Sequence, residues 1–239
     1  MKIILNPKFQ HLHDFLEHLE EHFPEGKLVQ DSFNEIRLLQ ADGLTLSVKR
    51  YGHSFKRRLK FYKTAKGKRA FISQRYLRER GYDSPEPVAF VRYRKNMVTQ
   101  STYLVTVRSQ LKYDLTQLAS FSEDEQKEIV QALASYTVRL HEDGFIHHNF
   151  KAKHVLFDKN ENGNWSFALI DVNRVHRHHY SIRTERGLKS FERLILPEAR
   201  LEQLAREYAR LRHYDENQAW NYVQVAHQAY QEKVRKRGR

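Results

Sequence analysis

The chain has 239 residues, of which 40% are hydrophobic and 12% aromatic, and this composition predicts a globular protein rather than a disordered one. It contains no cysteine, which excludes disulfides, zinc–thiolate sites and a thiol nucleophile. Lysine and arginine number 42 against 29 acidic residues, a net charge of +13 at pH 7 that favours anionic partners. The chain has neither a signal-peptide pattern nor the roughly 18 consecutive apolar residues of a membrane span, so we expect a soluble, cytoplasmic protein.

The first third of the chain predicts a helix followed by a hairpin. Apolar residues recur at three- and four-residue spacing from Phe9 to Phe23, which predicts an amphipathic helix over this segment. Residues 36–39 and 44–51 flank an Asp-Gly pair, a strong signal for a tight turn between two strands. Leu44, Leu46 and Val48 alternate with polar residues in the second strand, so Lys49 should point away from its apolar face.

The middle of the chain predicts a basic helix and two further strands. The helix covers about residues 64–80 and stops at Gly81. Two prolines make residues 83–87 a rigid turn, because each proline fixes its own φ and biases its predecessor towards extended geometry. Residues 88–93 and 102–107 have strand-like composition, with Lys95-Asn96 as a turn between them.

The second half predicts mostly helices. Ser122 and Glu125 form a capping box that opens a helix ending near Gly144. Two short apolar runs follow, residues 155–157 and 167–170, and the chain is mainly helical from Glu192 onward.

This order of elements predicts an α+β fold of two lobes. We expect a β-rich N-lobe over about residues 1–107, with an extra N-terminal helix, and a helical C-lobe over about residues 108–232. The basic tail, residues 233–239, is short and polar, and we expect it to be disordered.

Three segments have the residue types and order of a phosphoryl-transfer site. Lys49 ends a strand in the N-terminal half, Asn149 and His154 follow a long helix, and Asp171 ends a buried strand seventeen residues after His154. Phosphoryl transfer needs a cation on the nucleotide phosphates, a carboxylate on magnesium, and a group that orients the attacking hydroxyl. The three segments offer a residue for each role.

The sequence here resembles the Kdo/WaaP family of lipopolysaccharide kinases, bacterial relatives of the protein kinases. The resemblance runs from about Gly43 to Tyr208 and rests on the segments GLTLSVKRY, RAFISQRYLRERGYDSPEPVAF, LHEDGFIHHNFKAKHVLF and ALIDVNRVH. Its most specific parts are the helix followed by G-x-D-S-P-E-P and the phrase I-D-V-N-R, where generic kinases carry D-F-G. It implies a bilobal protein-kinase-like fold.

The resemblance also implies roles for individual residues. Lys49 takes the place of the lysine that holds the ATP phosphates, and Asp171 that of the magnesium carboxylate. Asn149 stands at the position of the catalytic aspartate, and His154 at that of a metal-binding asparagine. ATP and Mg²⁺ are the implied cofactors, and a sugar hydroxyl of the lipopolysaccharide core is the implied acceptor.

The sequence departs from the active pattern at three places. Asn149 cannot remove a proton as an aspartate could, and Ile72 occupies the position aligned with the helix glutamate that pairs with Lys49. No glycine-rich loop is visible between Gly26 and Ile36, so the residues that cover the phosphates are undefined. We therefore expect nucleotide binding, with phosphoryl transfer slow or absent.

The remaining histidines and basic residues have plainer explanations beside functional ones. His147 is expected to support the loop that carries Asn149, and the histidines at 176, 178 and 179 lack the spacing and acidic partner of a zinc site. Thirteen basic residues and one acid lie between Lys49 and Arg80. Such a segment suits a solvated face, an anionic glycolipid or an anionic membrane surface. Nucleic acid is not the expected partner, because no nucleic-acid-binding module is recognisable.

Three functions remain open from the sequence. The first is an ATP-dependent lipopolysaccharide-core kinase at the cytoplasmic face of the inner membrane, which the retention of Lys49 and Asp171 favours. The second is a pseudokinase that binds nucleotide or a partner without catalysis, which Asn149 and Ile72 favour. The third is a basic adaptor for anionic membrane or nucleic acid, which rests on charge alone.

Overall fold

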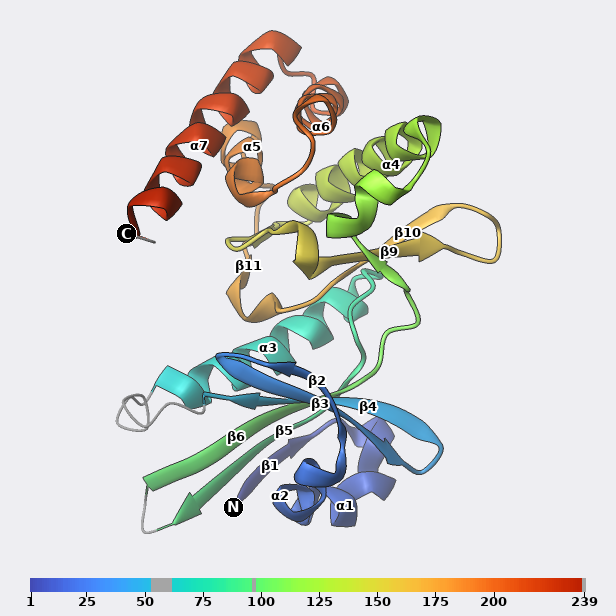
Figure 1. The fold of residues 1–239 in the computed structure, drawn as a ribbon, viewed down its shortest axis with the longest axis vertical. Coiled ribbons are helices and arrows are strands. Elements are labelled where there is room, and N and C mark those ends of the chain that lie inside the picture. Colours follow the sequence, from blue (N-terminus) through green and yellow to red (C-terminus); the bar gives the residue numbers. More distant parts are fainter. Residues whose placement is uncertain (53–61, 96–97, 238–239) are drawn as a thin grey trace. The chain divides into compact units, whose positions relative to one another are not determined.

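The computed structural model describes residues 1–52, 62–95 and 98–237 and divides the chain into two compact units, Met1–Gln110 and Leu111–Arg239. Unit 1 holds a six-stranded sheet and unit 2 most of the helices, so the predicted α+β class is confirmed (Figure 1). Among these residues, no helix has the length and apolar character needed to cross a membrane.

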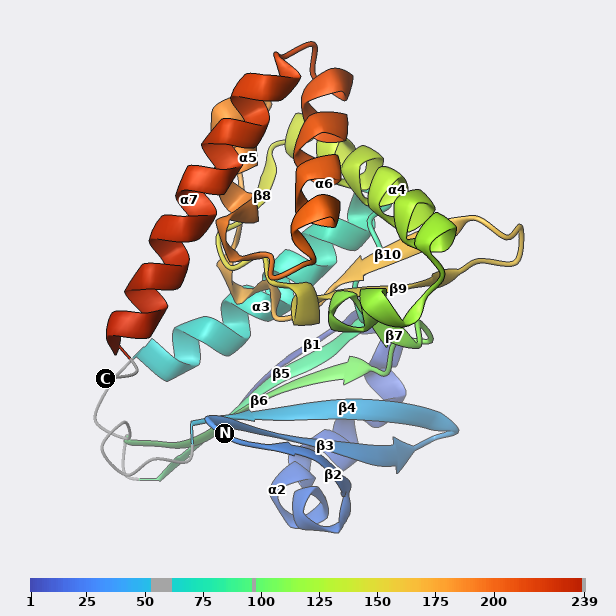
Figure 2. The ribbon, with the colours of Figure 1, turned by 45° about the horizontal axis from the view of Figure 1, so that its top comes forward.

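Unit 1 is an antiparallel sheet with helical segments on both faces (Figures 1 and 2). Its strands lie in the order β1-β5-β6-β4-β3-β2. The elements, in chain order, are β1 (Lys2–Leu5), the 3-10 helix η1 (Pro7–Leu12), α1 (His13–Glu17), α2 (Leu19–His22), η2 (Phe23–Glu25), β2 (Lys27–Asp31), β3 (Asn34–Ala41), β4 (Leu44–Tyr51), α3 (Tyr62–Glu79), β5 (Pro87–Lys95) and β6 (Val98–Val107).

The predicted hairpin is confirmed. Ala41 pairs with Leu44 across the turn, and Asp42 and Gly43 have φ of 47° and 72°. Positive φ at both central residues gives the turn a twist that matches that of the two strands.

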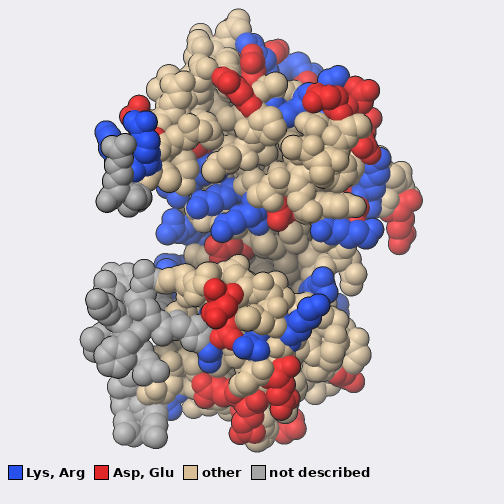
Figure 3. Space-filling view, in the orientation of Figure 1, with Lys and Arg blue, Asp and Glu red and all other residues tan. Residues whose placement is uncertain are grey.

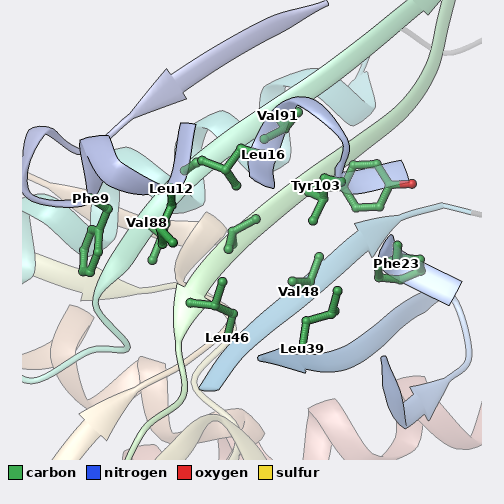
Figure 4. Close-up of a cluster of buried hydrophobic side chains, with 13 residues drawn as sticks. Phe9, Leu12, Leu16, Phe23, Leu39, Leu46, Val48, Val88, Val91 and Tyr103 are labelled. Carbon is green, nitrogen blue, oxygen red and sulfur yellow. The ribbon is translucent and has the colours of Figure 1, made fainter. Parts of the chain in front are cut away.

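Apolar side chains from β3, β4, β5, β6 and the N-terminal helical segments make the core on one face of the sheet, as Figure 4 shows. The residues labelled there are Phe9, Leu12, Leu16, Phe23, Leu39, Leu46, Val48, Val88, Val91 and Tyr103. A second cluster, in which Phe71 of α3 packs with Phe90 and Leu104, covers the opposite face. The central strands β4, β5 and β6 are therefore covered on both faces, whereas β2 is exposed along its length.

The single N-terminal helix predicted over Phe9 to Phe23 is wrong. The segment forms η1, α1, α2 and η2 because the backbone leaves the helical region at Phe9 (φ −112°, ψ 30°) and at His18 (φ −97°, ψ 16°). The apolar spacing still predicts correctly which residues are buried, since Phe9, Leu16 and Phe23 all are.

Unit 2 contains short sheets and a group of helices (Figure 1). Its elements, in chain order, are β7 (Tyr113–Asp114), η4 (Leu115–Ser120), α4 (Glu123–Glu142), β8 (Phe145–His147), η5 (Ala152–His154), β9 (Val155–Lys159), β10 (Trp165–Leu169), η6 (Val172–Arg174), β11 (Val175–Arg177), α5 (Thr184–Ser190), η7 (Phe191–Arg193), α6 (Glu198–Leu211) and α7 (Glu216–Arg237). The capping box predicted at Ser122 and Glu125 is present at the start of α4.

The prediction of a disordered basic tail is wrong through Arg237, where α7 ends. The chain from Glu216 to Arg237 contains neither proline nor glycine, and the lysines and arginines near its end are good helix formers. They also lie at the helix C-terminus, where positive charge is favourable. The turn predicted at Lys95-Asn96 and the basic residues from Lys56 to Lys60 lie wholly or partly outside the described residues.

Candidate active site

The loop between β8 and β9 is held by its own histidines. The backbone N–H of Asn149 donates to Nδ1 of His147 at 3.1 Å, so the proton of the neutral His147 ring lies on Nε2, which is 3.5 Å from the carbonyl of Ile170. Burial, with a smaller contribution from nearby His154, lowers the pKa of His147 to about 4. His147 is therefore neutral at pH 7 and supports the loop, as the sequence predicts.

His154 is oriented by the same loop. Its Nδ1 lies 2.9 Å from the carbonyl oxygen of Asn149, which can only accept, so Nδ1 carries the proton. In the neutral ring the lone pair then lies on Nε2, which is 3.7 Å from Oδ2 of Asp171. The ring stacks on His147 at a centroid distance of 5.9 Å, and its side chain is only 8% exposed.

Asp171 is fixed where β10 ends. The backbone N–H of Ile170 donates to the carbonyl of His154 at 2.9 Å, which ties this strand end to the loop. Asp171 then adopts the left-handed conformation, φ 54° and ψ 39°, a geometry that aspartate and asparagine tolerate better than most residues. Asn173 Nδ2 donates to Oδ1 at 3.0 Å, while the Asp171 side chain keeps 25% exposure.

Asp171 and His154 form a donor set that fits a divalent cation. A ligating histidine commonly donates its second ring N–H to a backbone carbonyl, as His154 does. Within residues 1–52, 62–95 and 98–237, no group of three or more histidine and acidic side chains is arranged so that it could hold a metal ion. The ion would therefore complete its coordination with water and substrate phosphate, as magnesium often does.

Asn149 has a partner that the sequence did not indicate. Nη1 of Arg193, in η7, donates to Oδ1 of Asn149 at 3.2 Å. Arg193 is held in turn by Glu192, 3.1 Å from its Nε, and its guanidinium lies 5.2 Å from the ring centroid of Tyr230 in α7. Forty-four residues separate Arg193 from Asn149, and no motif joins them.

Lys49 belongs to unit 1. Leu46 and Val48 are fully buried on one face of β4, and alternation places Lys49 on the other face, as predicted. Its Nζ lies 5.4 Å from the ring centroid of Tyr51, which belongs to the cluster beneath α3. Lys49 thus lies on the side of the sheet that α3 covers.

In α3, Gln74 is buried and Ile72 is not. Ile72 is 37% exposed, whereas Gln74 is 3% exposed and follows Ala70 and Phe71 on the buried face. Oε1 of Gln74 is buried and has no hydrogen-bond partner among the described residues. The position that the sequence aligned with the helix glutamate, Ile72, is thus on the exposed face of α3, and Gln74 is a buried polar residue of the same helix.

The turn between β2 and β3 is not rich in glycine. β2 ends at Asp31 and β3 begins at Asn34, with Ser32 and Phe33 between them. The ammonium of Lys66 in α3 lies 5.6 Å from the centroid of the Phe33 ring. The segment in which the sequence shows no glycine-rich loop, Gly26 to Ile36, therefore carries a bulky aromatic side chain, Phe33, in its turn.

Comparison with known proteins identifies the family. No curated protein sequence matches the chain. A solved structure described as "WaaP in complex with acyl carrier protein" is similar to it, with a TM-score of 0.65 and 18% identity over 96% of this chain and 99% of that one, which supports the fold. The model of the lipopolysaccharide kinase (Kdo/WaaP) family matches residues 32–216. The chain therefore belongs to the lipopolysaccharide kinase (Kdo/WaaP) family.

Proposed function

We propose that the protein is an ATP-dependent phosphotransferase that phosphorylates a sugar hydroxyl of an anionic glycolipid of the lipopolysaccharide-core type. Membership of the family supports a kinase-like role and a nucleotide as phosphate donor. The observation that carries the proposal is the pairing of His154 Nε2 with Asp171 Oδ2 at 3.7 Å, in a loop whose hydrogen bonds fix the histidine tautomer.

Each of the four predicted site residues has a role in this proposal. Lys49 binds the α- and β-phosphates, and Asp171 and His154 hold a divalent ion, which when bound neutralises charge on the phosphates. Asn149 orients the acceptor hydroxyl. Its Oδ1 accepts from Arg193 but has a second lone pair, and its Nδ2 offers two donors, so it can align an acceptor without removing a proton.

The charge of the chain supports the proposed acceptor and location. The chain carries a net charge of +13, and α3 has exposed Lys68 and Arg69 on its surface. Peripheral contact with the anionic cytoplasmic face of the inner membrane would bring such a surface close to a membrane-borne acceptor. This location remains part of the proposal.

A second candidate is a nucleotide-binding protein without transfer. Asn149 favours it, because a carboxamide cannot act as a general base and because Arg193 already donates to its oxygen. A positioned acid or base is typically worth about 10²–10⁴-fold in rate. In phosphoryl transfer, alignment and charge neutralisation contribute more, so loss of the base slows the reaction without abolishing it.

One transfer experiment distinguishes these candidates. Radiolabelled ATP is supplied with lipopolysaccharide core stripped of phosphate, and label transfer is measured for wild type, Asp171→Asn and Lys49→Met. Exposed Glu161→Gln in the β9–β10 turn and Lys27→Met in β2 serve as matched controls. The kinase requires transfer by wild type and both controls that falls at least 100-fold in the two site variants.

The other outcomes of this experiment support the alternative functions. Nucleotide binding that is lost in Asp171→Asn, with no transfer by wild type, selects the second candidate. If no variant binds nucleotide, both proposals fail and only a charge-driven adaptor remains.

A further inference from the structure

A cluster of basic side chains lies beside Asn149 in unit 2, and apart from Arg193, which holds Asn149, its members have no part in the roles described above. We define the histidine–arginine cluster as His148, His176, His178, Arg186 and Arg193. These residues come from the loop after β8, from β11 and the segment after it, from α5 and from η7. Figure 3 shows lysine and arginine side chains gathered on unit 2 around the position that β11 has in Figure 1.

Strand pairing brings the histidines together. β8 and β11 are antiparallel, with His147 opposite Val175 and Ile146 opposite His176. The backbone N–H of His148 donates to the carbonyl of Arg174 at 3.1 Å. The rings of His148 and His176 meet edge to face at a centroid distance of 4.8 Å. Backbone pairing of the two strands therefore brings the two imidazoles together.

The electrostatic surroundings of these histidines are mainly cationic. The pKa of His148 is lowered, mainly by partial burial and then by four basic neighbours: His176, Arg186, His178 and Arg193. The pKa of His178 is lowered by burial and then by Arg186, His176 and His179. Glu192 is the one carboxylate that the described contacts place on the cluster, where it pairs with Arg193. The positive charges of Arg186 and Arg193 disfavour protonation of these rings and favour a bound anion.

A further observation points to a ligand. Nε2 of His178 is buried and has no hydrogen-bond partner among the described residues. Its segment cannot move away from α4 easily, since the backbone N–H of His178 donates to the carbonyl of Gly144 at 2.8 Å. A buried polar atom without a partner is unfavourable, and a bound oxyanion or its water would offset this cost.

We propose that the histidine–arginine cluster binds an oxyanion, a phosphate monoester or a carboxylate, that the acceptor carries next to the hydroxyl it presents to Asn149. This assignment rests on the proposed function, because it takes Asn149 as the place of the acceptor. Arg193 joins the two sites, since one of its nitrogens holds Asn149 while the guanidinium also contributes to the field at His148. The cluster would thus select acceptors that are already anionic.

The site is tested with inorganic phosphate by NMR. The imidazole signals of His148 and His176 are assigned from His148→Gln and His176→Gln, and phosphate is titrated into the full chain at pH 7 with a magnesium-bound, non-hydrolysable ATP analogue present. We expect saturable shifts of both signals and a rise in both pKa values, because a bound anion favours the protonated rings. Arg186→Gln should weaken phosphate binding at least fivefold.

The control and the contrary results are specific. Arg206→Gln, in α6 and paired with Glu202 at 2.8 Å, should leave phosphate binding unchanged. Shifts spread evenly over the histidines, an unaltered affinity in Arg186→Gln, or loss of the phosphate response when the nucleotide analogue binds would overturn the proposal. Titrations with methyl phosphate and with acetate tell a phosphate ester from a carboxylate.

Failure of the kinase proposal would be visible separately. If the nucleotide analogue changes no signal while phosphate still shifts His148 and His176, the anion site stands and the phosphotransferase assignment falls.

Discussion

The guanidinium of Arg193 donates a hydrogen bond at 3.2 Å to the side-chain oxygen of Asn149, the residue proposed above to orient the acceptor hydroxyl. Arg193 is only 28% exposed and is also fixed by Glu192 and by the ring of Tyr230. Tyr230 lies in α7, beyond the residues that match the family. The amide of Asn149 is thus oriented by Arg193, whose guanidinium also contacts Tyr230 of α7.

Introducing a carboxylate at this position should stabilise the fold through the same arginine. We expect Asn149→Asp to raise the free energy of unfolding by about 1 kcal/mol at pH 7, because the bond to Arg193 becomes an ion pair in a partly buried place. In an Arg193→Gln background the same change should bring no gain. Urea denaturation followed by tryptophan fluorescence measures this, since both tryptophans, Trp165 and Trp220, lie in unit 2. Equal effects in both backgrounds would contradict the pairing.

A methyl group at Gly144 should be far more harmful than one at Gly163. Both glycines have positive φ, 80° and 76°, so alanine is strained at either. A Cβ on Gly144 would lie 2.3 Å from the carbonyl oxygen of His178, whereas a Cβ on Gly163 meets nothing within 4 Å. We expect Gly144→Ala to cost about 2 kcal/mol more than Gly163→Ala, since backbone cannot yield as a side chain can. Similar unfolding midpoints for the two variants would refute the close approach.

Acid should destabilise unit 2 through a buried histidine. Burial, and secondarily Arg212, lowers the pKa of His141 to about 3, and its Nδ1 lies 2.9 Å from the hydroxyl of Tyr208. The unfolded chain, with a histidine pKa near 6.5, binds more protons than the folded one below that pH. Stability is therefore complete above about pH 6.5 and declines as the pH falls towards 3, by about 2 kcal/mol from this residue at pH 5.

The measurement is tryptophan-monitored unfolding at pH 7 and pH 5. His141→Gln should be less stable at pH 7 but should lose about 2 kcal/mol less than wild type between the two pH values. Identical losses in wild type and variant would show that His141 does not carry the acid sensitivity.

Replacing Gln74 should weaken nucleotide binding without lowering the stability of the fold. Replacing it with leucine removes a buried oxygen that has no partner among the described residues, so we expect Gln74→Leu to leave stability unchanged or raise it by about 1 kcal/mol. If Gln74 faces Lys49 in the nucleotide site, the same variant should bind ATP at least fivefold more weakly. Ile72→Glu, on the exposed face of α3, is the control and should alter neither quantity appreciably. Unchanged ATP affinity in Gln74→Leu would remove this residue from the site.

Local patterns predicted much of the fold. The Asp-Gly turn, the alternation along β4 and the capping box at Ser122 are signals carried by neighbouring residues, and each element formed where the pattern placed it. Burial was predicted even where helix continuity was not, because Phe9 and Phe23 report a buried face whether one helix or four short segments carry them. β1 escaped prediction because a strand of four residues at a sheet edge has too short a pattern.

The sequence could predict only those site residues that follow a recognisable helix or strand. Asn149, His154 and Asp171 follow recognisable elements, and their loops bring them together within unit 2. Arg193 reaches Asn149 through tertiary packing, for which neither spacing nor composition gives a signal. Gln74 was missed because a polar residue on the buried face of α3 interrupts its apolar stripe, so the phase of that helix could not be read from hydrophobicity.

The identity of the metal ligands tests the central claim most directly. Mn²⁺ and a non-hydrolysable ATP analogue are added to the full chain, and electron spin echo measurements detect nitrogen bound to the ion. The account predicts an imidazole nitrogen signal that His154→Asn removes, and loss of the bound ion in Asp171→Asn but not in Glu161→Gln. A tightly bound ion with no imidazole nitrogen, or one that survives Asp171→Asn unchanged, would contradict it.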